Sequence, residues 1–162
     1  MSVGAILLAV ELVEDDRPLL EVAELQAKAL GAKLYLVHVM PPEADFVGLP
    51  KEAEANPASP DDDAQVGYAY DREVAADRAR TAHEKLHAMR DRLAAAGLTV
   101  TALLIEGPAA EKIAEEARRL GCDLIVVGAH QRGLLGKWLH GSTSRELLRD
   151  APCPVLVVPV AR

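Results

Sequence analysis

The residues most suited to binding chemistry lie near the C-terminal end, in the glycine-punctuated segment IVVGAHQRGLLGKWLHGSTSREL, residues 125–147. The segment opens with an apolar run that ends at Gly128, as a buried strand would. Near its end, Thr143 and Glu146 form a T-x-x-E capping box, the pattern with which many helices begin. The segment is therefore predicted to lead from a strand, through a glycine-rich loop, into a short helix.

A helix start of this kind is suited to binding an anion, because its unpaired N–H groups and positive dipole end favour negative charge. Gly141 lets the backbone approach a ligand closely. Three hydroxyl side chains follow, those of Ser142, Thr143 and Ser144. Three cations lie nearby in the sequence, Arg132, Lys137 and Arg145. The segment predicts a phosphate cradle, although the Walker pattern G-x-x-x-x-G-K-[ST] is absent; the alternative is that Gly141 and the cap only begin a helix.

A second pattern, HEKLH at residues 83–87, matches the H-E-x-x-H of zinc peptidases. On a helix, His83 and His87 share one face, and Glu84 could act as a base. The buried face is already supplied by Ala82, Leu86 and Met89. No third ligand stands nearby downstream, and the helix is expected to lie away from the ligand crevice. We therefore predict neither a peptidase nor a metal site.

The elements that must position these residues follow from the apolar periodicity. Short apolar runs predict five strands, at about 5–10, 33–40, 98–107, 123–128 and 152–160. Helical stripes between them predict four helices, at about 18–30, 71–96, 108–120 and 142–150. Alternating strands and helices predict an α/β fold, with a five-stranded parallel open sheet and helices on both faces. The strand order taken for this sheet is 3-2-1-4-5. Residues 1–162 are expected to form a single domain, with a long flexible loop at about 41–70, where prolines and an acidic run gather.

In such a sheet, ligands bind beyond the carboxyl ends of the strands, where the strand order reverses. That point lies between the first and fourth strands. Their ends are Val10–Glu11 and Gly128. The predicted phosphate cradle leaves from the same place, so these residues belong to one predicted site.

The composition of the chain argues against some classes of binding partner. The 162-residue chain has a formal net charge of −7, which disfavours a broad nucleic-acid or anionic-membrane surface. Its two cysteines, Cys122 and Cys153, have no metal-ligand spacing and are expected to be small buried thiols. No segment reaches membrane-spanning length, and the N-terminus has no signal-peptide pattern, so a cytoplasmic location is expected.

Two stretches resemble a known family. DLIVVGAH…GSTSRELLRDAPCPVLVVPV is similar to the C-terminal signature of the universal stress protein family, and ILLAVELVEDDRPLLEVAELQAKALGAKLYLVHVM is similar to its N-terminal third. The resemblance covers nearly the whole chain outside about 41–70. It implies the adenine nucleotide alpha hydrolase-like fold, a non-catalytic stress-response protein and usually a homodimer. In many members it also implies ATP, with Mg²⁺, bound at G-x2-G-x9-G-[ST].

Compared residue by residue, Gly128 matches the first motif glycine, and Gly141–Ser142 match the closing pair. Gln131 stands where the second glycine is expected. If that position needs positive φ, glutamine costs about 1 kcal/mol. GAHQ also resembles the GHHQ of a branch that is not thought to bind ATP, although that branch loses the closing Gly-Ser kept here.

Further site residues follow from the resemblance. Glu11 stands where ATP-binding members commonly carry Asp, and its carboxylate could accept a hydrogen bond from a ribose hydroxyl or the adenine amine. Val39 matches a position lining the adenine pocket; the alternative is that it is simply core. His130 and Gln131 could contact the nucleotide, or fill an empty site instead.

Two non-catalytic functions remain open, and a slow ATPase is a third alternative. The first is a homodimer that binds ATP or a related adenine nucleotide; the second is the same dimer without nucleotide, acting through protein–protein interaction. No base and nucleophile pair with each other in the sequence, so no catalytic residue is predicted. The apolar run Val155–Val158 lies on a predicted edge strand, and two-fold pairing of this edge would close the dimer.

Overall fold

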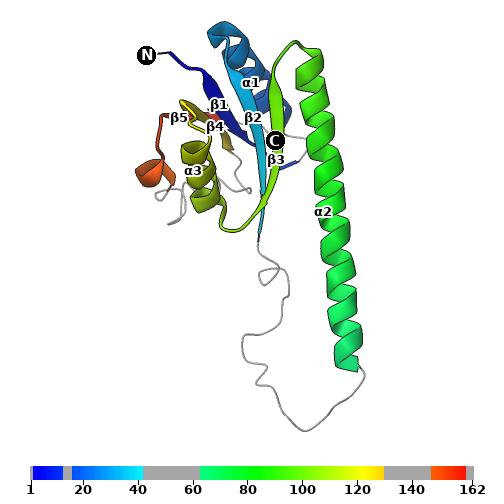
Figure 1. Ribbon diagram of the computed structural model, residues 1–162. Coiled ribbons are helices and arrows are strands. Elements are labelled where there is room, and N and C mark those ends of the chain that lie inside the picture. Colours follow the sequence, from blue (N-terminus) through cyan, green and yellow to red (C-terminus); the bar gives the residue numbers. More distant parts are fainter. Residues whose placement is uncertain (1, 13–15, 42–62, 130–146, 160–162) are drawn as a thin grey trace.

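The computed structural model describes residues 2–12, 16–41, 63–129 and 147–159 (Figure 1). Five parallel strands form one sheet, in the order β3-β2-β1-β4-β5. The strands are β1 (Ala5–Ala9), β2 (Lys33–Met40), β3 (Val100–Glu106), β4 (Leu124–Ala129) and β5 (Val155–Pro159). The helices are α1 (Arg17–Leu30), α2 (Asp63–Ala95) and α3 (Ala109–Arg119), followed by a helical turn at 147–150. The predicted fold class and strand order are confirmed.

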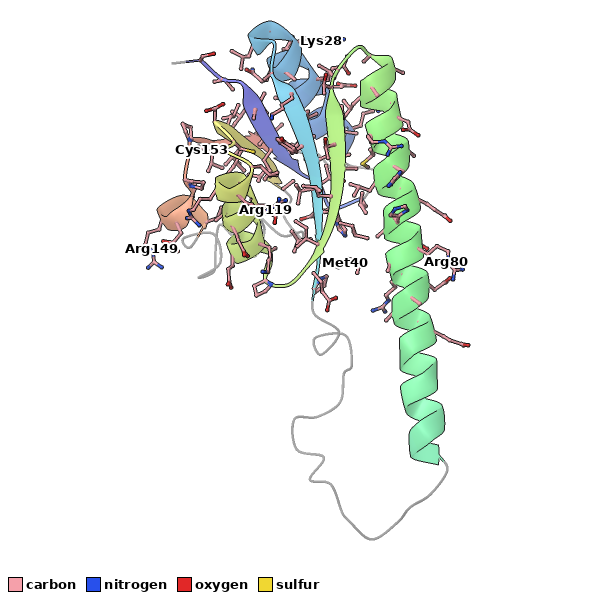
Figure 2. The ribbon with its side chains drawn as sticks, viewed as in Figure 1. Lys28, Met40, Arg80, Arg119, Arg149 and Cys153 are labelled. Carbon is pink, nitrogen blue, oxygen red and sulfur yellow. The ribbon has the colours of Figure 1, made fainter. Side chains whose placement is uncertain are left out.

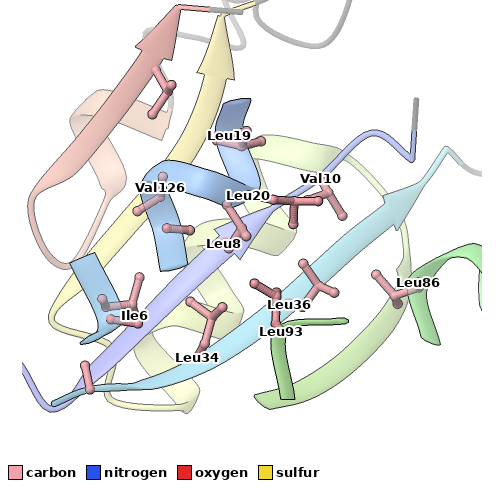
Figure 3. Packing of buried hydrophobic residues seen from close by; sticks show 14 of the residues in the cluster. Ile6, Leu8, Val10, Leu19, Leu20, Leu34, Leu36, Leu86, Leu93 and Val126 are labelled. Atoms are coloured by element: carbon pink, nitrogen blue, oxygen red, sulfur yellow. The ribbon is translucent and has the colours of Figure 1, made fainter. Parts of the chain in front are cut away.

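The central strand β1 is buried on both faces, because helices cover each side of the sheet. Ile6, Leu7 and Leu8 have no exposed surface. Ile6 and Leu8 pack with residues of α1 and α2, whereas Leu7 packs with residues of α3 on the opposite face. Figure 3 shows the first of these cores, in which side chains of β1 and β2 meet α1 and α2. A strand of this kind needs apolar residues at consecutive positions rather than at alternate ones.

Helix α1 begins with Asp16 at its N-cap position and Pro18 in its first turn, and it ends at Gly31, whose φ of 63° is left-handed. Both boundaries match the sequence prediction. Its buried face is formed by Leu19, Leu20, Ala23 and Ala27. Leu30, the last residue of the helix, is 44% exposed.

Helix α2 begins at Asp63, earlier than the predicted start near Asp71. The predicted loop at 41–70 was therefore wrong for residues 63–70, and its residues 42–62 lie outside the described part of the chain. Figure 1 shows the first turns of α2 projecting past the carboxyl ends of the strands. Its later turns are anchored by Leu86 and Leu93, which are 1% and 0% exposed.

The two cysteines are free thiols in different surroundings. Cys122 is buried and Cys153 is half-buried, so the expectation of two buried thiols is confirmed in full only for Cys122. Burial raises the pKa of the Cys122 thiol to about 11. This thiol is therefore protonated and unreactive at neutral pH.

Asp123 joins the amino ends of β1 and β4. Its Oδ2 accepts hydrogen bonds from the backbone N–H groups of Gly4 at 2.8 Å and Ala5 at 3.1 Å. Its own N–H donates to the Ala5 carbonyl at 2.8 Å. Asp123 therefore fixes the start of β1 against β4.

We expect Asp123→Ala to lower the free energy of unfolding by about 1–3 kcal/mol, because two backbone donors lose a charged acceptor. Urea denaturation followed by circular dichroism measures this change. Glu84→Ala removes an exposed carboxylate from α2 and is the matched control, with an expected change below about 0.5 kcal/mol. Equal losses in the two variants would contradict the assigned role.

Candidate functional site

Strand β1 ends between β2 and β4, at the point where the strand order reverses. Ala9 pairs with Val37 of β2 on one side and with Val127 of β4 on the other. The next residues, Val10, His38 and Gly128, therefore lie level across the sheet, and the predicted site residues Val10 and Gly128 are brought to neighbouring strand ends. Gly128 is buried and pairs with Val158 of β5.

The end of β1 is held by its neighbour β2. The Val10 N–H donates to the Val37 carbonyl at 2.9 Å, and the Val10 carbonyl accepts from Nδ1 of His38 at 2.8 Å. A carbonyl oxygen only accepts, so Nδ1 carries the proton, and Nε2 of a neutral His38 ring is an acceptor. The sequence analysis missed His38, whose signal is a polar residue in the strand run KLYLVHVM next to the switch point.

The chain turns sharply immediately after β1. Leu12 is 7% exposed and has a φ of 63°, the only positive φ of a non-glycine residue among those described. Its carbonyl accepts a long hydrogen bond from Nζ of Lys85 on α2, at 3.5 Å. A left-handed leucine costs on the order of 1 kcal/mol or more. Burial of its side chain and the contact with α2 are the interactions here that offset this cost.

A groove of about 830 Å³ opens between this turn and α2. Glu11, Leu12 and His38 line its sheet side. Its other wall consists of α2 residues between Glu73 and Lys85, and it mixes carboxylates with basic side chains. Figure 2 shows Arg80 on the outer side of α2. The groove thus presents both signs of charge beside the half-buried Glu11, which suits a polar ligand better than an apolar one.

Val39 lies on the opposite face of the sheet from Val10. It is 5% exposed and packs in the core that contains Val37 and the buried residues of α3, whereas Val10 packs with α1 and α2. A ligand at the strand ends would therefore reach the two valines from different sides of the sheet. Six predicted site residues lie outside the described residues: His130, Gln131, Gly141, Ser142, Thr143 and Ser144.

The helical turn that follows the predicted cradle is anchored to the α3 side of the sheet. Leu147 is 2% exposed and belongs to the core that contains Ile113 and Ile125. Arg118 of α3 donates to the Asp150 carbonyl at 3.2 Å. The described end of this segment is thus fixed against α3 and β4.

The HEKLH pattern lies on α2; its Lys85 lines the groove, whereas His83 and His87 are not among the lining residues. The rings of His83 and His87 stand with their centroids 4.0 Å apart and their planes tilted by 32°. Desolvation and the neighbouring His83 lower the pKa of His87. Among the described residues, no three side chains of the metal-ligating types come together, and no helix is long and apolar enough to cross a membrane.

Comparison with known proteins identifies the family. The model of the universal stress protein family matches residues 3–159. The chain is 33% identical over 138 residues to a Thermus aquaticus universal stress protein encoded in the QAH/OAS sulfhydrylase 3′ region, covering 85% of each protein.

Solved structures share the fold. The hypothetical protein MJ0577 superposes with a TM-score of 0.73 at 20% identity, over 100% of this chain and 99% of that one. A universal stress protein in complex with cAMP superposes with a TM-score of 0.63 at 18% identity, over 99% of this chain and 100% of that one. With the family model matching almost from end to end, this chain belongs to the universal stress protein family.

Proposed function

We propose that this protein is a non-catalytic, homodimeric stress protein that binds ATP or a related adenine nucleotide, with Mg²⁺, at the carboxyl ends of β1 and β4. The proposal rests on one observation: Val10 and Gly128 lie side by side on neighbouring strands, where the strand order reverses. Open α/β sheets bind their ligands at this position. A structural relative in complex with cAMP supports an adenine nucleotide as the ligand.

The residues around this point suit the parts of a nucleotide. Glu11 lies just after β1 and lines the groove, so in this proposal its carboxylate accepts a hydrogen bond from a ribose hydroxyl or an adenine amine. The sequence of residues 141–144, Gly-Ser-Thr-Ser, supplies backbone amides and hydroxyls for the phosphates. In this proposal Val39 contributes an apolar contact from the α3 face.

In this proposal the protein binds the nucleotide and does not hydrolyse it. His38, a described histidine beside the end of β1, bonds the Val10 carbonyl. In this proposal the bound nucleotide acts as a signal read by a partner.

We expect millimolar Mg-ATP to raise the melting temperature of the purified protein. At about a hundred times its dissociation constant, a ligand adds roughly 2.7 kcal/mol to the free energy of unfolding. Gly141→Asp should abolish the shift, because a carboxylate would repel the phosphates. Gly136→Asp adds the same charge to a loop glycine outside the G-x2-G-x9-G-[ST] motif and should retain it.

The alternative, a dimer that acts without nucleotide, predicts no melting shift and no nucleotide released when the purified protein is denatured. Both results together would overturn nucleotide binding and leave the alternative. A shift that persists in Gly141→Asp would instead overturn the assignment of the phosphate cradle.

Gln131→Gly restores the second motif glycine and should tighten ATP binding about fivefold, which corresponds to the roughly 1 kcal/mol of strain expected for glutamine at that position. Isothermal titration calorimetry measures the change. Gly133→Ala, at a loop glycine outside the motif, is the control and should leave the affinity within twofold. Weaker binding in Gln131→Gly would indicate that the glutamine side chain itself contacts the nucleotide.

The proposed dimer pairs β5 with its copy. β5 is the last strand in the sheet order, and Val157 exposes 37% of its surface. An apolar edge strand is a template for pairing with another chain. The flanking Pro154 and Pro159 would limit the ladder to the short segment between them.

Val157→Lys is therefore expected to convert the dimer to a monomer, because a charged edge opposes strand pairing. Light scattering coupled to size-exclusion chromatography measures the mass. Leu25→Lys places the same charge at an exposed leucine of α1, 65% exposed, and should leave the dimer intact. A dimer that survives Val157→Lys would contradict the β5 interface.

A further inference from the structure

We propose that His83 and His87 form a two-histidine binding site on α2 for a divalent transition-metal ion of the nickel and zinc class. The two residues stand one turn apart on a continuous helix. Their ring centroids are 4.0 Å apart. His83 is exposed and His87 is half-buried, so both rings are reachable from solvent.

The ring geometry is close to what one ion needs. Imidazole nitrogens bind zinc at about 2.0–2.1 Å, so two nitrogens that share a tetrahedral or octahedral ion lie roughly 3–3.4 Å apart. Residues at i and i+4 project from the same helical face. Rings whose centroids lie 4.0 Å apart are close enough for side-chain rotation to bring one nitrogen of each onto a shared ion. The sequence spacing predicts that the two histidines share one helical face, and the structure adds the distance between their rings.

The neighbouring charges permit a cation. Arg90 stands one turn after His87 and would repel an ion, but its guanidinium bonds the Asp91 carboxylate at 2.6 and 2.9 Å. Asp91 follows His87 by one turn of α2, and its ion pair with Arg90 offsets the repulsion between the guanidinium and a bound cation.

The ligand class follows from the donors. Imidazole suits nickel, copper and zinc, whereas magnesium and calcium prefer oxygen ligands. Because the described residues supply no third ligand, water would fill the remaining coordination positions, so the ion would exchange with solvent. This open two-point site differs from a zinc peptidase centre, which needs three protein ligands.

The site is separate from the proposed nucleotide crevice. The α2 residues that line the groove include Thr81, Ala82 and Lys85, and they do not include His83 or His87. Metal bound by both rings bridges two successive turns, so it binds only where α2 is helical. Loading should therefore raise the melting temperature in the absence of nucleotide.

The test is calorimetric titration of untagged, full-length protein with NiCl₂ and ZnCl₂, without nucleotide. Copper is avoided because Cys153 is a half-exposed thiol that copper would oxidise. His83→Gln and His87→Gln should each weaken binding at least tenfold and remove the metal-induced rise in melting temperature. MgCl₂ and CaCl₂ should give no binding.

Two matched controls decide between a paired site and scattered histidines. The double variant His87→Ala/Ala88→His keeps two histidines on α2 but turns them to different faces, and it should bind as weakly as His87→Gln. His140→Gln removes a histidine elsewhere in the chain and should leave the affinity within twofold.

Three results would overturn the proposal. The first is wild-type binding no tighter than that of the double variant His83→Gln/His87→Gln. The second is full affinity in His87→Ala/Ala88→His, and the third is loss of binding in His140→Gln. Unchanged circular dichroism of each variant at room temperature verifies that α2 is still folded, as expected for substitutions on its solvent-facing flank. None of these readouts depends on nucleotide binding.

Discussion

Parallel pairing of β1 on both of its edges is the constraint on which the rest of the structure depends. Its hydrogen bonds to β2 and β4 place the strand at the centre of the sheet. Since parallel neighbours need crossover connections, the chain must place helices on both faces, and β1 must be apolar on both. The same arrangement reverses the strand order at β1 and β4, so the fold and the position of the candidate site have one cause.

The pairing of β1 fixes the position at which the strand ends. Two side chains from other elements fix the conformation of the turn that follows it. His38 of β2 bonds the Val10 carbonyl, and Lys85 of α2 contacts the Leu12 carbonyl. Glu11 therefore stands between two backbone groups that are held from outside the turn. A carboxylate on such a segment is better positioned for a ligand than one on an unconstrained loop, because less conformational entropy is lost on binding.

The sequence was informative where a residue's type determines its environment. Consecutive apolar residues such as Ile6–Leu8 and Ile125–Val127 predicted buried strands, and the alternation of elements with the family resemblance predicted the strand order. The start of α2 was missed because prolines upstream suggested a loop, yet no proline follows Pro60 there, and Asp61–Asp63 offered acidic residues suited to a helix start. The sequence could not predict roles that depend on partners far away in the chain. The hydrogen bonds between Asp123 and the start of β1, and between His38 and Val10, are of this kind. The sheet topology predicted that Val10 and Gly128 would lie on neighbouring strands, and the structure places them there. The part of the candidate site at residues 130–146 lies outside the described residues and stays a prediction.

Helix α2 differs along its length, and this difference bears on both proposed ligands. Among its described side chains, only Leu86 and Leu93 are fully buried, and both lie in its later turns. The groove-lining residues from Glu73 to Thr81 precede those anchors, so the sheet side of the groove is fixed more firmly than its α2 side. His83 and His87 instead flank Leu86, where the helix is held against the sheet. A metal ion bound by the two histidines would stabilise turns of α2 that are already anchored. A ligand in the groove would instead order the less anchored part of α2. Binding in the groove should therefore carry the larger cost in conformational entropy.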